Sequence, residues 1–351
     1  MIELSIDLGS KYFRVAQRGV GILLSEPCIA IVEKYKNKYE IADAGYAAES
    51  IISKAMGAIR VVEPVKEGII VDEELFIKLI KYFFKKIYPK KFVKPTIKAI
   101  ISITCSMSNS ERRVVEKCFY KAGIKEIILV ESPISLLAES KSVGGLFVDI
   151  GGGKTEVCAV TNRGIINGYT VNIAGDAFNE AIIDKANLQY GVKIGKNTIE
   201  SLKKSALSLY VNDDASYPIT GGGTSGEIKT LTITAKFMRE AVIPRLNDII
   251  EVIMLVISET APELSSEILR KGITLTGNSV NIPGLIDYFK KALELQINVL
   301  SDIDNSVVLG GTKFFDNKKV LSQMLGVKII WLRTKYLITD IKCQESALGH
   351  I

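Results

Sequence analysis

Two segments of the chain repeat one pattern, and this repeat constrains the fold more than any other feature of the sequence. Residues 5–16 read SIDLGSKYFRVA, and residues 147–160 read FVDIGGGKTEVCAV. In each segment an apolar strand ends at an aspartate, an apolar residue and a glycine turn follow, and a second apolar strand begins. We therefore predict two copies of one domain that face each other across a cleft, with a glycine turn on each side.

Length and composition exclude several classes of protein. The chain has 351 residues, of which 47% are hydrophobic, and a formal net charge of +6. This length fits two domains, and the hydrophobic fraction excludes an intrinsically disordered chain. The charge is too small to indicate a nucleic-acid partner. The five cysteines form no CxxC pair and indicate buried reduced thiols, while the single histidine, His350, argues against histidine-based catalysis.

The beginning of the chain carries no targeting signal. MIELSIDLGS lacks the basic and apolar regions of a signal peptide. No stretch reaches the ~18 apolar residues that a membrane-spanning helix needs. We therefore expect a cytoplasmic protein.

Apolar periodicity predicts a mixed α/β protein in which strands and helices alternate after an initial group of strands. The predicted strands cover residues 2–8, 12–17, 28–32, 97–103, 126–131, 145–149, 155–161, 164–171, 272–276 and 296–300. The predicted helices cover residues 73–88, 110–122, 175–188, 199–210, 235–260, 283–293 and 306–316. A glycine-rich hairpin is expected around residues 220–226.

The glycine turns suit a polyphosphate ligand. A turn of small residues between two strands lets backbone N–H groups converge on an anion. Asp7 and Asp149 stand just before the two turns, where carboxylates suit Mg²⁺ held directly or through its waters. A third turn, residues 276–279, also follows a predicted strand. The alternative is that these turns are only hairpins, and the chain has no Walker A motif.

With the later segment GITLTGNSVNIPGL, the pair DLGSKYF and DIGGGKTEV resembles the actin and sugar-kinase ATPase superfamily, and within it MreB, the bacterial actin homologue. Four further segments fit in order, so that the resemblance covers about residues 1–320: GILLSEPCIAIV, AIRVVEPVKEGIIVD, SERRVVEKCFYKAGIKEIILVESP and INGYTVNIAGDAFNEAII. The resemblance implies an actin-like α/β fold with duplicated ribonuclease-H-like subdomains, two small inserted subdomains and a central nucleotide cleft.

The resemblance also implies domain boundaries. The first half is expected over residues 1–140, with its small insertion at about 33–60. The second half is expected over 141–327, with its insertion at about 190–235 and a return of the chain to the first half near 306–327. Residues 328–351 extend past the resemblance as a C-terminal extension, which could dock on the body or bind a partner.

The function implied by the resemblance is an ATP-binding cytoskeletal protein. MreB binds ATP or ADP with Mg²⁺ between its halves and assembles into paired antiparallel filaments that organise cell shape. Position by position, the resemblance assigns the phosphate turns to Ser10, Lys11, Tyr12, Gly151, Gly152 and Gly153. It assigns the nucleoside side to Glu200, Lys203, Gly277, Asn278 and Ser279, and the metal side to Asp7 and Asp149.

The chain departs from the family pattern at the positions that take part in ATP hydrolysis. MreB proteins carry Glu-Glu-Pro where this chain has Glu131-Ser132-Pro133. They carry Gly-Gly-Gly-Thr where this chain has three glycines followed by Lys154. Both replaced side chains position the attacking water, which phosphoryl transfer requires. Asn278 and Ser279 stand where the family has glycines. Similar substitutions occur in MreB copies of wall-less helical bacteria, and the chain resembles that type.

Two interpretations of Ser132 and Lys154 remain open. In the first, which we favour, the protein binds ATP and hydrolyses it slowly, with Lys154 holding the γ-phosphate. In the second, Lys154 replaces part of the role of the metal ion, and Glu131 positions the water.

One loop is a candidate membrane contact. Residues 85–98, KKIYPKKFVKPTIK, hold six lysines with Tyr88, Phe92 and Val93 between them. Lysines near an anionic leaflet contribute about 1 kcal/mol each. The alternative is a solvated loop whose lysines only keep the surface soluble. The expected partners are therefore further copies of the chain, an anionic membrane and other filament proteins.

Two other functions are possible on the same fold. A sugar or acid kinase needs an acidic base aimed at a substrate hydroxyl, and Ser132 and Lys154 supply none. A non-polymerising adaptor or chaperone-type ATPase needs a substrate domain after the ATPase, for which the last ~30 residues are too few.

Overall fold

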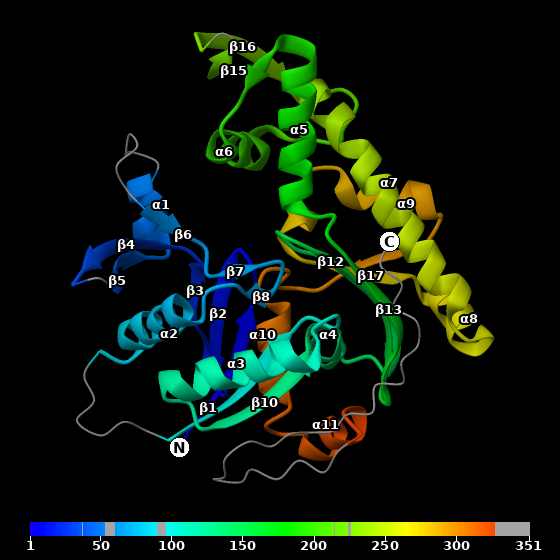
Figure 1. Cartoon of the computed structure of the whole chain (residues 1–351). Helices are drawn as coiled ribbons and strands as arrows, with labels where there is room; N and C mark the ends of the chain where they lie inside the picture. Colours follow the sequence, from blue (N-terminus) through cyan, green and yellow to red (C-terminus); the bar gives the residue numbers. More distant parts are fainter. Residues whose placement is uncertain (37, 53–59, 90–95, 214, 224–225, 327–351) are drawn as a thin grey trace.

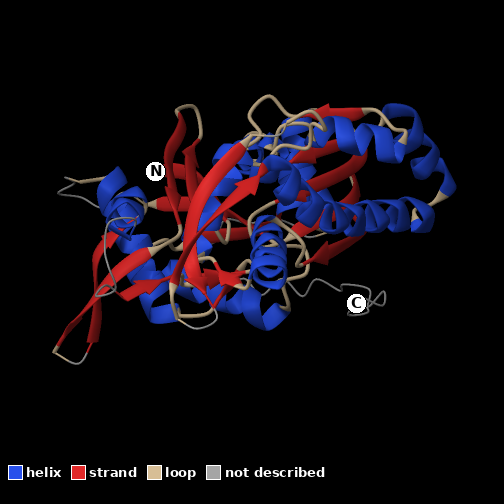
Figure 2. Ribbon diagram, turned by 90° about the horizontal axis from the view of Figure 1, so that it is seen from above, coloured by secondary structure: helices blue, strands red, loops and turns tan. Residues whose placement is uncertain are grey.

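The computed structural model describes residues 1–36, 38–52, 60–89, 96–213, 215–223 and 226–326. Two five-stranded sheets form the frame of the molecule, with helices packed on both faces of each (Figures 1 and 2). Because the strands alternate with helices and bury both faces, they read in the sequence as nearly continuous apolar runs.

The first sheet has the order β10-β9-β1-β2-β3. β1 pairs with β9 and β9 with β10 in parallel, whereas the β1–β2 and β2–β3 pairs are antiparallel. Its strands are β1 (Ile2–Leu8), β2 (Tyr12–Gln17), β3 (Gly21–Pro27), β9 (Ile97–Ile103) and β10 (Glu126–Glu131).

The second sheet repeats this arrangement. Its order is β13-β12-β11-β17-β18, again with one antiparallel meander and two parallel pairs. Its strands are β11 (Gly144–Ile150), β12 (Thr155–Thr161), β13 (Gly164–Val171), β17 (Ile273–Thr276) and β18 (Ile297–Val299). The repeat seen in the sequence is therefore a repeat of sheet topology, with β1 and β2 equivalent to β11 and β12.

Two smaller sheets stand apart from the frame. The first, β5-β4-β6, and the second, β14-β15-β16, lie at the left and the top of Figure 1. β7 (Val65–Lys66) and β8 (Ile69–Ile70) form a two-stranded hairpin. The small-sheet strands are β4 (Ala30–Tyr35), β5 (Lys38–Ala44), β6 (Arg60–Val62), β14 (Val192–Lys193), β15 (Ser216–Gly223) and β16 (Ile228–Thr234).

Capping residues mark both ends of α3. In α3, Ser108 and Glu111 form a capping box, and Gly123 ends the helix in the left-handed conformation. The helices are α1 (Tyr46–Ile52), α2 (Glu73–Ile87), α3 (Asn109–Ala122), α4 (Ser132–Ser140), α5 (Gly175–Tyr190), α6 (Lys196–Ala206), α7 (Ala235–Glu259), α8 (Pro262–Lys271), α9 (Leu285–Leu293), α10 (Ser306–Lys313) and α11 (Lys318–Met324), with a 3₁₀ turn at Asn278–Asn281.

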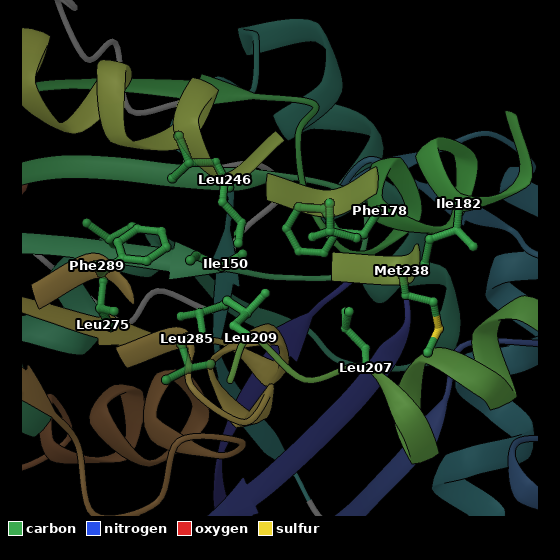
Figure 3. Close-up of a cluster of buried hydrophobic side chains, with 14 of the residues drawn as sticks. Ile150, Phe178, Ile182, Leu207, Leu209, Met238, Leu246, Leu275, Leu285 and Phe289 are labelled. Carbon is green, nitrogen blue, oxygen red and sulfur yellow. The ribbon is translucent and has the colours of Figure 1, made fainter. Parts of the chain in front are cut away.

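Three apolar cores hold these layers together. One joins the first sheet to α2 and α3, and the largest joins the second sheet to α5, α7 and α9. Figure 3 shows part of the largest, where Phe178 of α5, Leu246 of α7 and Phe289 of α9 gather around Ile150 of β11. These side chains are almost fully buried, and burial of this kind stabilises a fold by roughly 25 cal/mol per Å².

The third core lies between the two sheets. Its members come from the other faces of both sheets and from α4, α10 and α11, which ties the beginning of the chain to its end. They are Ile100, Val130, Ile134, Leu136, Leu137, Phe147, Cys158, Val160, Val307, Phe314, Phe315, Leu321 and Met324.

Several predicted elements need correction. No helix is predicted between residues 131 and 145, yet α4 begins at Ser132, since proline is tolerated in the first turn of a helix. The helix predicted over 199–210 ends at Ala206, and the carbonyls of the following residues accept hydrogen bonds from Arg239. The predictions omit β3, β5, β6, β7, β8, β14, α1, α8 and α11, whereas the strand predicted over 28–32 overlaps β4 and the hairpin predicted around 220–226 coincides with the paired strands β15 and β16.

Candidate nucleotide site

The two repeated glycine turns face each other. The first turn, residues 9–11, joins β1 to β2, and the second, residues 151–154, joins β11 to β12. A Cβ atom added to Gly152 would overlap the side chain of Lys11, and one added to Gly153 would lie 3.3 Å from Ser10 Oγ. The structure thus brings together the residues that the repeat alone suggested. Glycine is needed at 152 because Lys11 crosses this position.

Two further segments close around the second turn. The backbone N–H groups of Gly175 and Asp176, at the start of α5, donate to the carbonyls of Gly151 and Gly152 at 3.2 and 2.7 Å. Ser279 Oγ, in the third turn, donates to Gly151 O at 3.0 Å. The helix start and the third turn therefore fix the second turn from one side.

Lys11 spans the space between the two sheets. Its Nζ lies 3.0 Å from Asp176 Oδ1 and 3.7 Å from Glu63 Oε1. Burial alone would lower the pKa of Lys11, but these two carboxylates raise it, so the lysine stays charged. A fixed ammonium at the meeting point of two glycine turns suits a phosphate group.

Tyr12 contacts two aromatic or cationic side chains of the first half of the chain. Its ring lies 6.4 Å from the ring of Tyr46, which begins α1, and the guanidinium of Arg14 lies 4.9 Å from its centroid. Burial raises the pKa of Tyr12 above its usual value. Tyr12 therefore lies beside the start of α1.

Glu200 and Lys203 form a network beside the second turn. Lys203 Nζ donates to Glu200 Oε2 at 2.7 Å and to Gly175 O at 2.8 Å, and Asn179 donates to the same Glu200 oxygen at 2.7 Å. Burial alone would raise the pKa of Glu200, but Lys203 and Asn179 lower it to about 2. The pair thus links α6 to the start of α5.

Asp7 and Asp149 lie at equivalent ends of β1 and β11 in different charge environments. Arg14 Nη1 lies 3.2 Å from Asp7 Oδ2, whereas the residue opposite Asp149 on β12 is Glu156. Burial, Glu156 and Asp7 raise the pKa of Asp149 to about 7.

These two carboxylates do not fit a shared Mg²⁺ ion in the way the resemblance implies. Asp7 already has a cationic partner in Arg14, whose other amino group donates to Asn278 Oδ1 at 2.9 Å. Among the described residues no group of three or more acidic, cysteine or histidine side chains could hold a metal ion.

The three residues expected near the attacking water have other contacts. Ser132 Oγ donates to Ile103 O at 3.1 Å, and Glu131 Oε1 accepts from Arg112 at 2.7 Å. Lys154 lies against Gly68, whose added Cβ would lie 2.8 Å from its Nζ. Burial lowers the pKa of Lys154, although Glu156 opposes the shift. In the described part of the chain, no hydrogen bond joins Ser132 to Lys154.

Four residues at the site were missed by the sequence analysis: Arg14, Asp176, Glu156 and Asn179. Glu156 Oε1 accepts from Thr104 Oγ1 at 2.8 Å and from Cys105 N at 2.7 Å, and so links β12 to the end of β9. Arg14 offered one signal, because a charged residue inside an otherwise apolar strand needs a buried partner.

The fold and site define a class: an actin-like protein with two equivalent α/β sheets and glycine turns facing each other between them. A family model described as MreB/Mbl protein matches residues 1–323. The chain belongs to the MreB/Mbl family. The resemblance and the actin-like fold predicted from the sequence are confirmed.

Individual relatives agree with this assignment. The cell shape-determining protein MreB of Escherichia coli is 29% identical over 320 residues, covering 89% of this chain and 92% of the relative. The cell shape-determining protein Mbl of Bacillus subtilis is 27% identical over 325 residues, covering 90% and 96%. MreB5 of Spiroplasma citri, solved bound to ADP, is 26% identical with a TM-score of 0.81, covering 91% of this chain and 97% of that one.

Proposed function

We propose that the chain is a cytoskeletal protein that binds ATP and ADP between its two sheets. The observation that carries this proposal is the meeting of the two glycine turns, with Lys11 between them. Family membership supports it, as does the similar MreB5, which was solved with ADP. The boundary between the halves would then lie near residue 140, between the end of α4 and the start of β11.

We further propose self-assembly into double, antiparallel filaments that act in cell shape or motility. This proposal is supported by the family to which the chain belongs, because its relatives are named cell shape-determining proteins. A head-to-tail contact that does not close into a ring propagates into a filament. Other filament proteins of the same cell are the natural second partners.

Slow hydrolysis of the bound ATP is part of the proposal. Ser132 Oγ donates to Ile103 O and Glu131 Oε1 accepts from Arg112, and these contacts with protein groups support slow hydrolysis. This arrangement favours the interpretation in which Lys154 holds the phosphate over the one in which Glu131 positions the water.

Calorimetry and electron microscopy test these proposals together. Titration of the full chain with ADP and with a non-hydrolysable ATP analogue should give one site per chain. Micrographs after addition of ATP should show paired filaments, whose polarity follows from image reconstruction. Absence of any nucleotide binding would overturn the site, while binding with only monomers or dimers across salt conditions would overturn the assembly.

We also propose that residues 85–98 contact an anionic membrane, with a solvated loop as the alternative. Lys86 pairs with Glu26 and Lys98 with Glu126, so these two lysines already have acidic partners. Phe92 and Val93 lie outside the described residues, as does the extension 328–351. No described helix is long and apolar enough to cross a membrane. Sedimentation with anionic and with neutral vesicles separates the two readings.

A further inference from the structure

Arg14 is a buried cation between the first sheet and the third turn. It lies on β2 with 7% of its surface exposed, pairs with Asp7, and donates across to Asn278 of the third turn. A charged group is rarely buried to this degree unless a partner of opposite charge holds it. Arg14 thus bridges the first sheet to a turn that belongs to the second.

Only the first of the two repeated copies carries a positive charge at this position. Asp7 pairs with Arg14 across β1 and β2, and the equivalent Asp149 pairs with Glu156 across β11 and β12. One structural position therefore holds a guanidinium in the first copy and a carboxylate in the second. Packing common to both copies cannot explain the arginine.

The guanidinium also reaches toward Asp149. Asn278, which accepts its hydrogen bond, follows Gly277, and a Cβ atom on Gly277 would overlap Asp149 Oδ1. The arginine thus extends from Asp7 to the turn that covers Asp149. Its Nε has no hydrogen-bond acceptor among the described residues, so one buried donor remains for a further group.

We propose that Arg14 is the resident cation of the cleft, taking the electrostatic role of a divalent metal ion at Asp7, so that nucleoside di- and triphosphates bind about equally well with and without Mg²⁺. This rests on the proposed nucleotide site. An unpaired Asp7 would repel a polyphosphate unless a metal ion lay between them, and the guanidinium removes that need. Lys11 lies at the same turns, but Asp176 and Glu63 already pair with its ammonium, which leaves Arg14 as the cation beside Asp7.

The first test compares two buffers with the unmodified full chain. The dissociation constant for ADP is measured by calorimetry in excess Mg²⁺ and in excess EDTA. We expect the two values to agree within about threefold, which corresponds to less than 1 kcal/mol. A loss of more than about tenfold in EDTA overturns the inference and leaves the proposed function intact. No binding in either buffer overturns both.

Substitutions then assign the effect to the guanidinium. Arg14→Leu should bind ADP about tenfold or more weakly in EDTA and recover in Mg²⁺, because Asp7 is then unpaired. Arg14→Lys keeps the charge and should keep the ratio between the buffers near one. Asn278→Ala keeps the guanidinium beside Asp7, so any loss of affinity should be equal in both buffers.

Two results on the variants would contradict the inference. An equal loss in both buffers for Arg14→Leu would make the arginine a purely structural residue. Mg²⁺ dependence in Arg14→Lys would show that positive charge is not what Arg14 supplies. Thermal unfolding of each variant shows whether it folds, and if Arg14→Leu does not, the unmodified chain and Arg14→Lys still decide the question.

Discussion

Gly152 lies so close to Lys11 that a side chain at this position would displace the lysine from Asp176. Gly152→Val should therefore abolish ADP binding, with affinity falling by more than about hundredfold. Calorimetry on the folded variant measures this. The matched control is Gly222→Val in β15, because no atom of the described residues lies within 4 Å of a Cβ added to Gly222. Unchanged affinity in Gly152→Val would exclude a phosphate site between the two turns.

The two substituted positions near the attacking water give a second prediction at the residue scale. Ser132→Glu and Lys154→Thr made together should raise phosphate release by ~10²–10³, the usual effect of one aligned polar group at a transition state. Either single change should recover little, because groups that act on one water are not additive. Phosphate release at saturating ATP measures the rate. A parent chain as fast as the double variant would show that another group positions the water.

At the scale of elements, Arg239 anchors the segment after α6 to α7. It is buried, and its guanidinium donates to the carbonyls of Ser208, Tyr210 and Val211. Arg239→Met should lower the free energy of unfolding by about 3 kcal/mol, since hydrogen bonds to a charged group contribute about 1.5–3 kcal/mol. Arg245→Met on the same helix is the control, because its pair with Asp248 is exposed and contributes about 0–1 kcal/mol. Equal unfolding temperatures for the two variants would refute the anchoring role.

Apart from β3, the strands of the two large sheets could be predicted, because their apolar runs and flanking glycines are local signals. β5 of the first small sheet could not, because Lys38 and Glu40 are charged and exposed and their neighbours are only partly buried, so that no apolar run marks the strand. The helix boundary at Ala206 depends on Arg239, which lies more than 30 positions away, and no local pattern reveals it. At the site, the glycine turns could be predicted, but the contact of Arg14 with Asn278 and that of Ser132 with Ile103 depend on how distant segments pack.

At the scale of the whole molecule, α10 crosses α4 in the core between the two sheets. Gly310 lies against the carbonyl of Ser135, and a Cβ atom there would overlap it. Helix propensity alone predicts that Gly310→Ala stabilises a helix by about 1 kcal/mol. We expect the opposite sign, a loss of about 1–3 kcal/mol from overpacking, measured by thermal or urea unfolding. Gly222→Ala, at an open position, is the control, and a Gly310→Ala variant more stable than the parent would contradict this packing.

The return of α10 to the core shared with β9 and α4 has a consequence for biosynthesis. The face of the first sheet that α10 covers is complete only after Val307, Phe314 and Phe315 have been made. At ~5–20 residues per second, the ribosome reaches them on the order of ten seconds to a minute after the first strand. During that interval the N-terminal half exposes apolar surface on a tethered nascent chain. Chaperones that bind emerging polypeptides should therefore hold this chain until its last helices leave the ribosome.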